Sequence, residues 1–135
     1  MLSNKEIEQI IIKNEYLLKD ALINSDTEVL NSLLDDSLVF TIRKVDMTKE
    51  DYLKSNPEYK HRVYRSDFCL QVFKKITETT VDIDLWVDIK ARFCGTEFEG
   101  KYKYIHTWKL CEDNKYRLIS GTIKKEEENK IPLDK

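Results

Sequence analysis

His106 is the side chain of this sequence best suited to chemistry near neutral pH, because imidazole exchanges its proton in that range. It lies in an alternating segment, residues 98–110, on the same parity as Tyr104 and Trp108. As a general acid or base it would need a carboxylate to orient its ring. Its alternative role is that of a core or interface histidine that is hydrogen bonded to a neighbour. The carboxylate candidates are three aspartates of the preceding segment: Asp82, Asp84 and Asp88.

Asn14 is a second candidate, because it is a polar residue in the middle of a helical apolar stripe. A Ser3-x-x-Glu6 capping box predicts the start of this helix. A buried amide must find partners or water. Asn14 is therefore either a satisfied core group or a ligand-facing group in a pocket. The stripe that surrounds it repeats at helical spacing: Ile7, Ile10, Ile11, Leu17, Leu18, Ala21 and Leu22.

The remaining acidic, cysteine and histidine residues form no metal-binding pattern. Asp35 and Asp36 fall between a short helix, for which Ser25-x-x-Glu28 predicts a capping box, and a strand at residues 37–42, so we interpret them as turn or capping groups. The cysteines are odd in number, and neither a C-x-x-C motif nor metal-ligand spacing is present. We expect no metal, no cofactor and a reducing, cytoplasmic setting. The residues concerned are Cys69, Cys94, Cys111, His61 and His106.

Residues 80–93, T-V-D-I-D-L-W-V-D-I-K-A-R-F, organise the rest of the chain. Every residue on one parity is apolar, and Trp86 lies on the other parity among charges, so the segment predicts a long amphipathic strand. One strand cannot bury such a face alone and needs neighbouring strands and a helical layer. With a third short helix from Thr48, this predicts an α+β fold with its helices on one face of a sheet. Further strands are predicted at residues 37–42, 59–65, 67–74, 98–110 and 116–123.

The composition suits one domain with a solvated surface. The chain has 135 residues, of which 41% are hydrophobic and 36% charged, and its net charge is -2. That balance disfavours a dedicated nucleic-acid binder, and neither a signal sequence nor an apolar run of about 20 residues is present. We expect a domain at residues 1–123, followed by a charged, disordered tail at residues 124–135.

Three segments together resemble the nuclear transport factor 2-like superfamily, which includes SnoaL-like and ketosteroid-isomerase-like proteins. They are the short helix, acidic pair and apolar strand within residues 26–40, T-K-E-D-Y-L at residues 48–53, and the final hairpin with T-W-K-L at 107–110 and Y-R-L-I at 116–119. The group that the sequence resembles most is domain of unknown function 4440. The resemblance implies a cone-shaped, curved antiparallel sheet with three N-terminal helices on its concave face, a pocket closed by the first helix, and often a homodimer through the other face.

The residues that would carry the isomerase chemistry of that superfamily are absent at the matching positions. Thr41 occupies the position of the catalytic aspartate and cannot act as a base near neutral pH. Tyr16 is out of register with the oxyanion-stabilising tyrosine, and Thr122 matches a position where the closer group usually has a histidine. The usual glycine before the third helix is also missing from residues 43–47. A mechanism taken directly from the superfamily is therefore not expected.

Three functions remain open at this point. The first is a domain that binds a small, largely apolar molecule in an enclosed pocket, with Asn14, Thr41, Tyr104 and His106 as its polar residues. The second is an isomerase, dehydratase or cyclase that uses His106. The third is a protein-interaction or immunity-type subunit. Trp86 on a charged parity predicts a covered surface, hence a partner, and the resemblance implies that this partner is a second copy of the chain bound through the sheet, although an isolated exposed tryptophan would give the same pattern.

Overall fold

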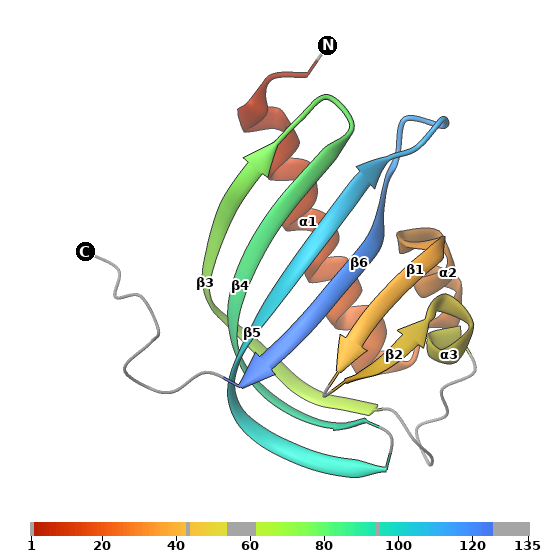
Figure 1. The fold of residues 1–135 in the computed structure, drawn as a ribbon, viewed down its shortest axis with the longest axis vertical. Helices are drawn as coiled ribbons and strands as arrows, with labels where there is room; N and C mark the ends of the chain where they lie inside the picture. Colours follow the sequence, from red (N-terminus) through yellow and green to blue (C-terminus); the bar gives the residue numbers. More distant parts are fainter. Residues whose placement is uncertain (1, 43, 54–61, 94, 126–135) are drawn as a thin grey trace.

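The computed structural model describes residues 2–42, 44–53, 62–93 and 95–125. Its single six-stranded sheet has the strand order β2-β1-β6-β5-β4-β3 (Figure 1). The strands are β1 (Leu34–Ile42), β2 (Val45–Thr48), β3 (Arg62–Ile76), β4 (Thr80–Phe93), β5 (Thr96–Leu110) and β6 (Tyr116–Lys125). The helices are α1 (Asn4–Asn24), α2 (Thr27–Leu33) and α3 (Lys49–Leu53).

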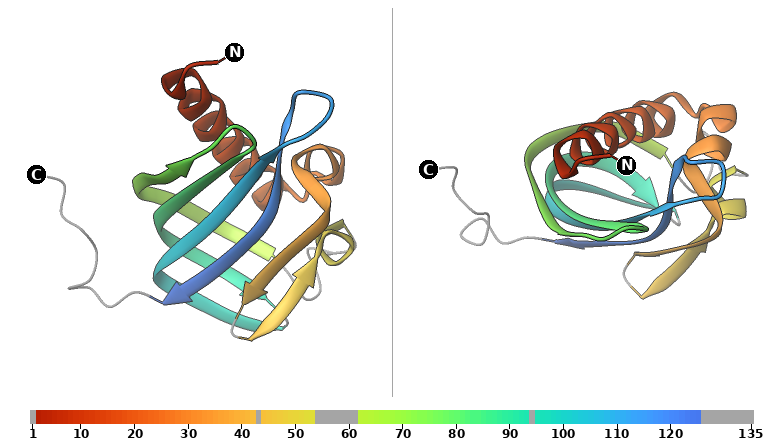
Figure 2. Two further views of the ribbon diagram at one scale, coloured as in Figure 1. Left: turned by 45° about the horizontal axis from the view of Figure 1, so that its top comes forward. Right: turned by 90° about the horizontal axis from the view of Figure 1, so that it is seen from above.

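The sheet curves around α1, which lies along its concave side, as the view from above shows (Figure 2). The predicted capping box at the start of α1 is present, since Ser3 and Glu6 each accept a hydrogen bond from the other's backbone N–H. Apolar residues on one side of the helix are buried against the sheet, among them Ile11 and Leu18. The α+β architecture with helices on one face is therefore confirmed.

The alternation of β4 decides which face of the sheet is the core. Its apolar parity, from Val81 to Phe93, is buried. Antiparallel pairing with β5 sets Ile83 opposite His106 and Leu85 opposite Tyr104. Because directly paired residues share a face, the pairing brings the polar aromatic residues of β5 to the concave, helix-covered side.

Several local predictions were wrong in detail. The sheet is mixed and not wholly antiparallel, because β1 runs parallel to β6. One continuous strand, β3, replaces the two strands predicted at residues 59–65 and 67–74. Its pairing with β4 shifts register at three places along the strand. The N-cap of α2 is Asp26, whose Oδ1 accepts the N–H of Val29 at 3.2 Å, whereas Ser25 ends α1 in a left-handed conformation.

The strand predicted at residues 37–42 begins earlier, at Leu34, so Asp35 and Asp36 lie on β1 and do not end a helix. Strand β2 was not predicted. Of the charged tail predicted at residues 124–135, Lys124 and Lys125 belong to β6, and residues 126–135 lie outside the described residues, as do His61 and Cys94. Among the described helices, none is both long enough and apolar enough to cross a membrane.

Candidate functional site

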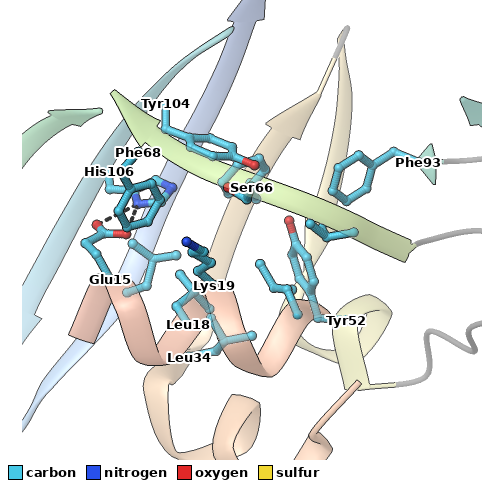
Figure 3. A pocket seen from close by; sticks show the side chains of 14 residues that line it. Glu15, Leu18, Lys19, Leu34, Tyr52, Ser66, Phe68, Phe93, Tyr104 and His106 are labelled. Carbon is cyan, nitrogen blue, oxygen red and sulfur yellow. Dashed lines mark hydrogen bonds and ion pairs between the residues drawn. The ribbon is translucent and has the colours of Figure 1, made fainter. Parts of the chain in front are cut away.

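A small cavity lies between α1 and the concave face of the sheet (Figure 3). Its free volume is about 30 Å³, which is room for roughly two water molecules. Most of the lining is apolar and comes from α1, β1, β3 and β6. The polar and aromatic lining residues that concern the chemistry are Glu15, Lys19, Ser66, Phe68, Tyr104 and His106.

Glu15 is the buried acid of this cavity. It lies four residues after Ile11 and three before Leu18 on α1, so helical periodicity turns it toward the sheet with those two apolar residues. Its exposed fraction is only 2%. A carboxylate in that position must be paired or hydrogen bonded, because an isolated buried charge is costly.

Two side chains of β5 hold the Glu15 carboxylate. Nδ1 of His106 lies 2.7 Å from Oε2 and 3.0 Å from Oε1, and the indole Nε1–H of Trp108 donates to Oε2 at 2.7 Å. The two residues share a face because they are two positions apart on one strand. Since indole nitrogen only donates, two short contacts converge on one acceptor oxygen, and we assign the ionised carboxylate with the proton on Nδ1 of His106.

With the proton on Nδ1, the neutral form of the His106 imidazole presents a free lone pair at Nε2. Nε2 is buried and has no hydrogen-bond partner among the described residues, and the His106 side chain lines the cavity. Tyr104 lies beside it, with a ring-centroid separation of 5.0 Å. Burial, and secondarily the negative charge of Glu15, raise the pKa of Tyr104, so its hydroxyl keeps its proton. The cavity therefore contains an acceptor nitrogen beside a phenolic donor.

Lys19 and Phe68 line the more exposed part of the cavity. The Lys19 ammonium lies 5.1 Å from the ring centroid of Phe68 and 5.4 Å from that of Tyr16, and the two rings are 4.9 Å apart. Among the described residues, no carboxylate forms an ion pair with Lys19. A half-buried cation on α1 thus faces the same cavity as His106.

The structure brings two of the sequence-predicted pocket residues together, Tyr104 and His106, and both line the cavity. Asn14 is half-buried on α1 but is not part of the lining. Thr41 follows the inward-facing Phe40, so it points to the convex face, where its hydroxyl donates to Asp46 at 2.8 Å. The residue that sequence reasoning missed is Glu15. Its position in the spacing 7, 11, 15, 18, 22 was the available signal.

The carboxylate that orients His106 is Glu15, so the expectation that Asp82, Asp84 or Asp88 would do so was wrong. Those aspartates lie on the convex parity of β4. Asp82 accepts from Thr107, Asp84 pairs with Lys103 at 3.3 Å, and Asp88 pairs with Arg65 at 3.2 Å. They therefore point away from the ring that they were expected to orient.

Trp86 also lies on the convex parity, yet it is only 6% exposed within the single chain. The Lys103 ammonium lies 5.0 Å from its ring centroid. Its burial therefore needs no partner subunit, and the homodimer predicted from this residue stays a prediction. Among the described residues, no three histidine, cysteine or acidic side chains are grouped as a metal site would require.

Comparison with known proteins identifies the fold. No family model and no curated protein matches the sequence. An NTF2-like protein from Cytophaga hutchinsonii has 24% identity and a TM-score of 0.76 over 90% of this chain and 98% of its own. A protein from Catenulispora acidiphila in complex with S-DNPA has 12% identity and a TM-score of 0.68, covering 89% and 93% of the two chains.

ActVI-ORFA from Streptomyces coelicolor has 8% identity and a TM-score of 0.68, covering 88% of this chain and 96% of its own. The group called domain of unknown function 4440 stays a prediction. The agreement extends over nearly the whole length of each of these proteins while identity is low, so it concerns the backbone arrangement. This chain has the nuclear transport factor 2-like fold.

Proposed function

We propose that this domain binds a small, largely apolar molecule in the cavity between α1 and the sheet. The observation that carries the proposal is the Nε2 atom of His106, which is buried beside the cavity and has no hydrogen-bond partner in the part of the chain that the structure describes. Native proteins satisfy nearly all buried polar atoms, and a bound molecule or water is the usual partner where protein atoms supply none. The apolar lining around a few polar groups is typical of ligand sites.

Binding requires the cavity to enlarge, because about 30 Å³ is far below the ~300 Å³ or more of ordinary ligand pockets. The half-buried side chains of Lys19, Leu22 and Phe68 are the lining groups that can move with little loss of packing. A protein of this fold has been solved with a small molecule, S-DNPA, which is compatible with such use of the fold.

The first test is native mass spectrometry of the freshly purified protein, followed by ¹H–¹⁵N spectra with benzyl alcohol, cyclohexanone and benzoate. We expect either a retained mass or a shift of the Trp108 indole N–H, which is bonded to Glu15 at the site. The indole of Trp86, on the convex face, is the internal control. The proposal would be overturned if the measured mass were that of the protein alone and none of the three compounds shifted the Trp108 indole resonance.

A matched pair of variants locates the binding. Ser66→Val places a larger side chain at the buried, cavity-lining Ser66, whereas Ser120→Val makes the same change at an exposed position of β6. We expect the first to abolish the Trp108 shift and the second to leave it unchanged. Equal binding by both variants would mean that the molecule sits elsewhere.

The contact between Glu15 and His106 favours an enzyme of the isomerase, dehydratase or cyclase type as a second candidate. Nε2 would take a proton from a carbon next to a carbonyl group and return it to another atom of the same molecule. The Tyr104 hydroxyl would donate to the oxygen that becomes negative. A ligand found by NMR is incubated in D₂O with the protein and with His106→Gln. Deuterium incorporation only by the unaltered protein supports catalysis, and recovery of unlabelled ligand contradicts it.

A further inference from the structure

We propose that the ligand of this cavity is a weak acid, a small apolar molecule with one carboxylate or comparably acidic hydroxyl. The acid group binds Nε2 of His106, which takes up a proton, and the Lys19 ammonium adds a favourable interaction with the negative charge of the ligand. This inference rests on the proposed function and names its ligand class. It is drawn from three charged or titratable groups that face one cavity: Glu15, Lys19 and His106.

The charges of the cavity balance only when an anion enters together with a proton. With Glu15 ionised, Lys19 protonated and His106 in the neutral form that leaves Nε2 as an acceptor, the empty cavity has no net charge. The other titratable lining groups are Tyr52 on α3 and Tyr104 on β5, which are neutral phenols. A monoanion alone would add an uncompensated charge to a largely apolar site, which is costly. Protonation of Nε2 restores neutrality and turns the nitrogen into a donor.

The Glu15 contact prepares His106 for that proton. Nδ1 already donates to the carboxylate, so an imidazolium formed on Nε2 protonation remains paired on its other side at 2.7 Å. The proton on Nε2 has one of two sources. A carboxylic acid transfers its O–H proton to Nε2, whereas a carboxylate that is already ionised binds together with one proton from solvent. The product in both cases is an anion hydrogen bonded to Nε2–H.

Lys19 favours a negatively charged ligand over a positively charged one. Its ammonium faces the cavity over the ring of Phe68 and has no ion-pair partner among the described residues. An ammonium ligand would meet a like charge there, and both oxygens of Glu15 are already engaged by β5. A carboxylate gains a favourable interaction at the same place. Neutral ligands gain nothing from Lys19, so its contribution can be measured separately.

The experiment compares benzoate, benzyl alcohol and benzylamine, which share one ring and differ in charge. Dissociation constants come from the Trp108 indole shift. We expect benzoate to bind at least about tenfold more tightly than the other two, and its affinity to fall as the pH rises, because each bound anion carries one extra proton. Histidine ¹⁵N spectra should report the proton on Nε2 directly.

Two lysine variants on α1 complete the test. Lys19→Met keeps an apolar stem and removes the charge, and Lys13→Met makes the same change at an exposed position. We expect Lys19→Met to weaken benzoate by about tenfold more than it weakens benzyl alcohol, while Lys13→Met changes neither. Equal binding of benzoate and benzyl alcohol, or no effect of Lys19→Met, overturns the acid assignment while binding itself stands. Failure of benzoate, benzyl alcohol and benzylamine to bind overturns the acid assignment, and it overturns the proposed function as well if the protein retains no extra mass and cyclohexanone does not shift the Trp108 resonance.

Discussion

Glu15 and His106 are 91 positions apart in the chain, and their side chains meet at 2.7 Å in the core. The contact joins α1 to β5 at the edge of the cavity (Figure 3). It is strengthened by Trp108, which donates to the same oxygen of Glu15. One buried carboxylate thereby fixes the docking of the first helix and the orientation of the histidine ring.

Removal of the Glu15 carboxylate should destabilise the fold. Glu15→Ala leaves the Trp108 indole N–H and the His106 Nδ1–H buried without an acceptor, and such a loss costs about 3 kcal/mol. Glu15→Gln keeps an acceptor oxygen for Trp108 and should cost less. Urea denaturation that follows tryptophan fluorescence measures both changes.

Asp20→Asn is the matched control for Glu15, since Asp20 is an exposed acid on the same helix. Its free energy of unfolding should stay within about 0.5 kcal/mol of the unaltered value. If Glu15→Ala behaves like Asp20→Asn, the buried contact has no structural importance and the assigned orientation of His106 loses its support.

Gly121→Ala should disturb the site from β6. A Cβ atom at this position would lie 2.5 Å from two ring carbons of Phe40 and 3.1 Å from Cδ2 of His106. Phe40 is buried and cannot swing away, so we expect a destabilisation of about 2 kcal/mol. The His106 resonances should shift at the same time.

Ser120→Ala, one residue before Gly121, is the control for that substitution, because Ser120 is exposed on the convex face. Thermal denaturation of both variants gives the comparison. An unchanged midpoint for Gly121→Ala would show that the strand can move away from Phe40.

The pair Asp113–Arg117 should contribute to acid sensitivity. The side-chain hydrogen bonds from Arg117 lower the pKa of Asp113 from 3.8 to about 2. Because the folded-state pKa lies below the unfolded value, the stabilisation is complete above about pH 4 and is lost as the pH falls through 2. Carboxyl ¹³C titration should show the pKa of Asp113 rising toward 3.8 in Arg117→Met. A titration that is unchanged by this variant contradicts the assignment.

The homodimer through the convex face gives a further prediction. Val39 is an exposed apolar residue on that face, 43% accessible, and Val45 on β2 is a matched valine with 46% accessibility that pairs with inward-facing Ile42. Charged residues are depleted from interface cores, so Val39→Glu should weaken a dimer at least about tenfold. Val45→Glu should not. Light scattering across a concentration series measures this, and a monomer in the unaltered protein refutes the dimer.

The fold was largely predictable because its signals are local. Alternation in residues 80–93 predicts a strand that is buried on one side, and the capping box at Ser3 predicts the start of a helix. Both signals depend on residues only a few positions apart. The parallel pairing of β1 with β6 was not predictable from the same signals, since it joins residues as far apart in the chain as Phe40 and Gly121.

The site was predictable only in part. Tyr104 and His106 share a parity with Trp108, but parity alone cannot say which face of the sheet the helix covers. Asn14 was predicted as the polar residue of the helical stripe, whereas Glu15 is the one buried against the sheet. The sequence contains no sign that two hydrogen-bond donors of β5 lie opposite that carboxylate.

The sequence by itself determined the apolar face of β4 and the amphipathic character and start of α1. Only the tertiary structure decided that Glu15 is the acid of the cavity and that Asp82, Asp84 and Asp88 face away from it. It also decided that Nε2 of His106 meets no hydrogen-bond partner among the residues described. Local periodicity specifies which way a side chain points along its own element. What it meets there depends on how α1 docks against β5, which is set by the packing of the whole core.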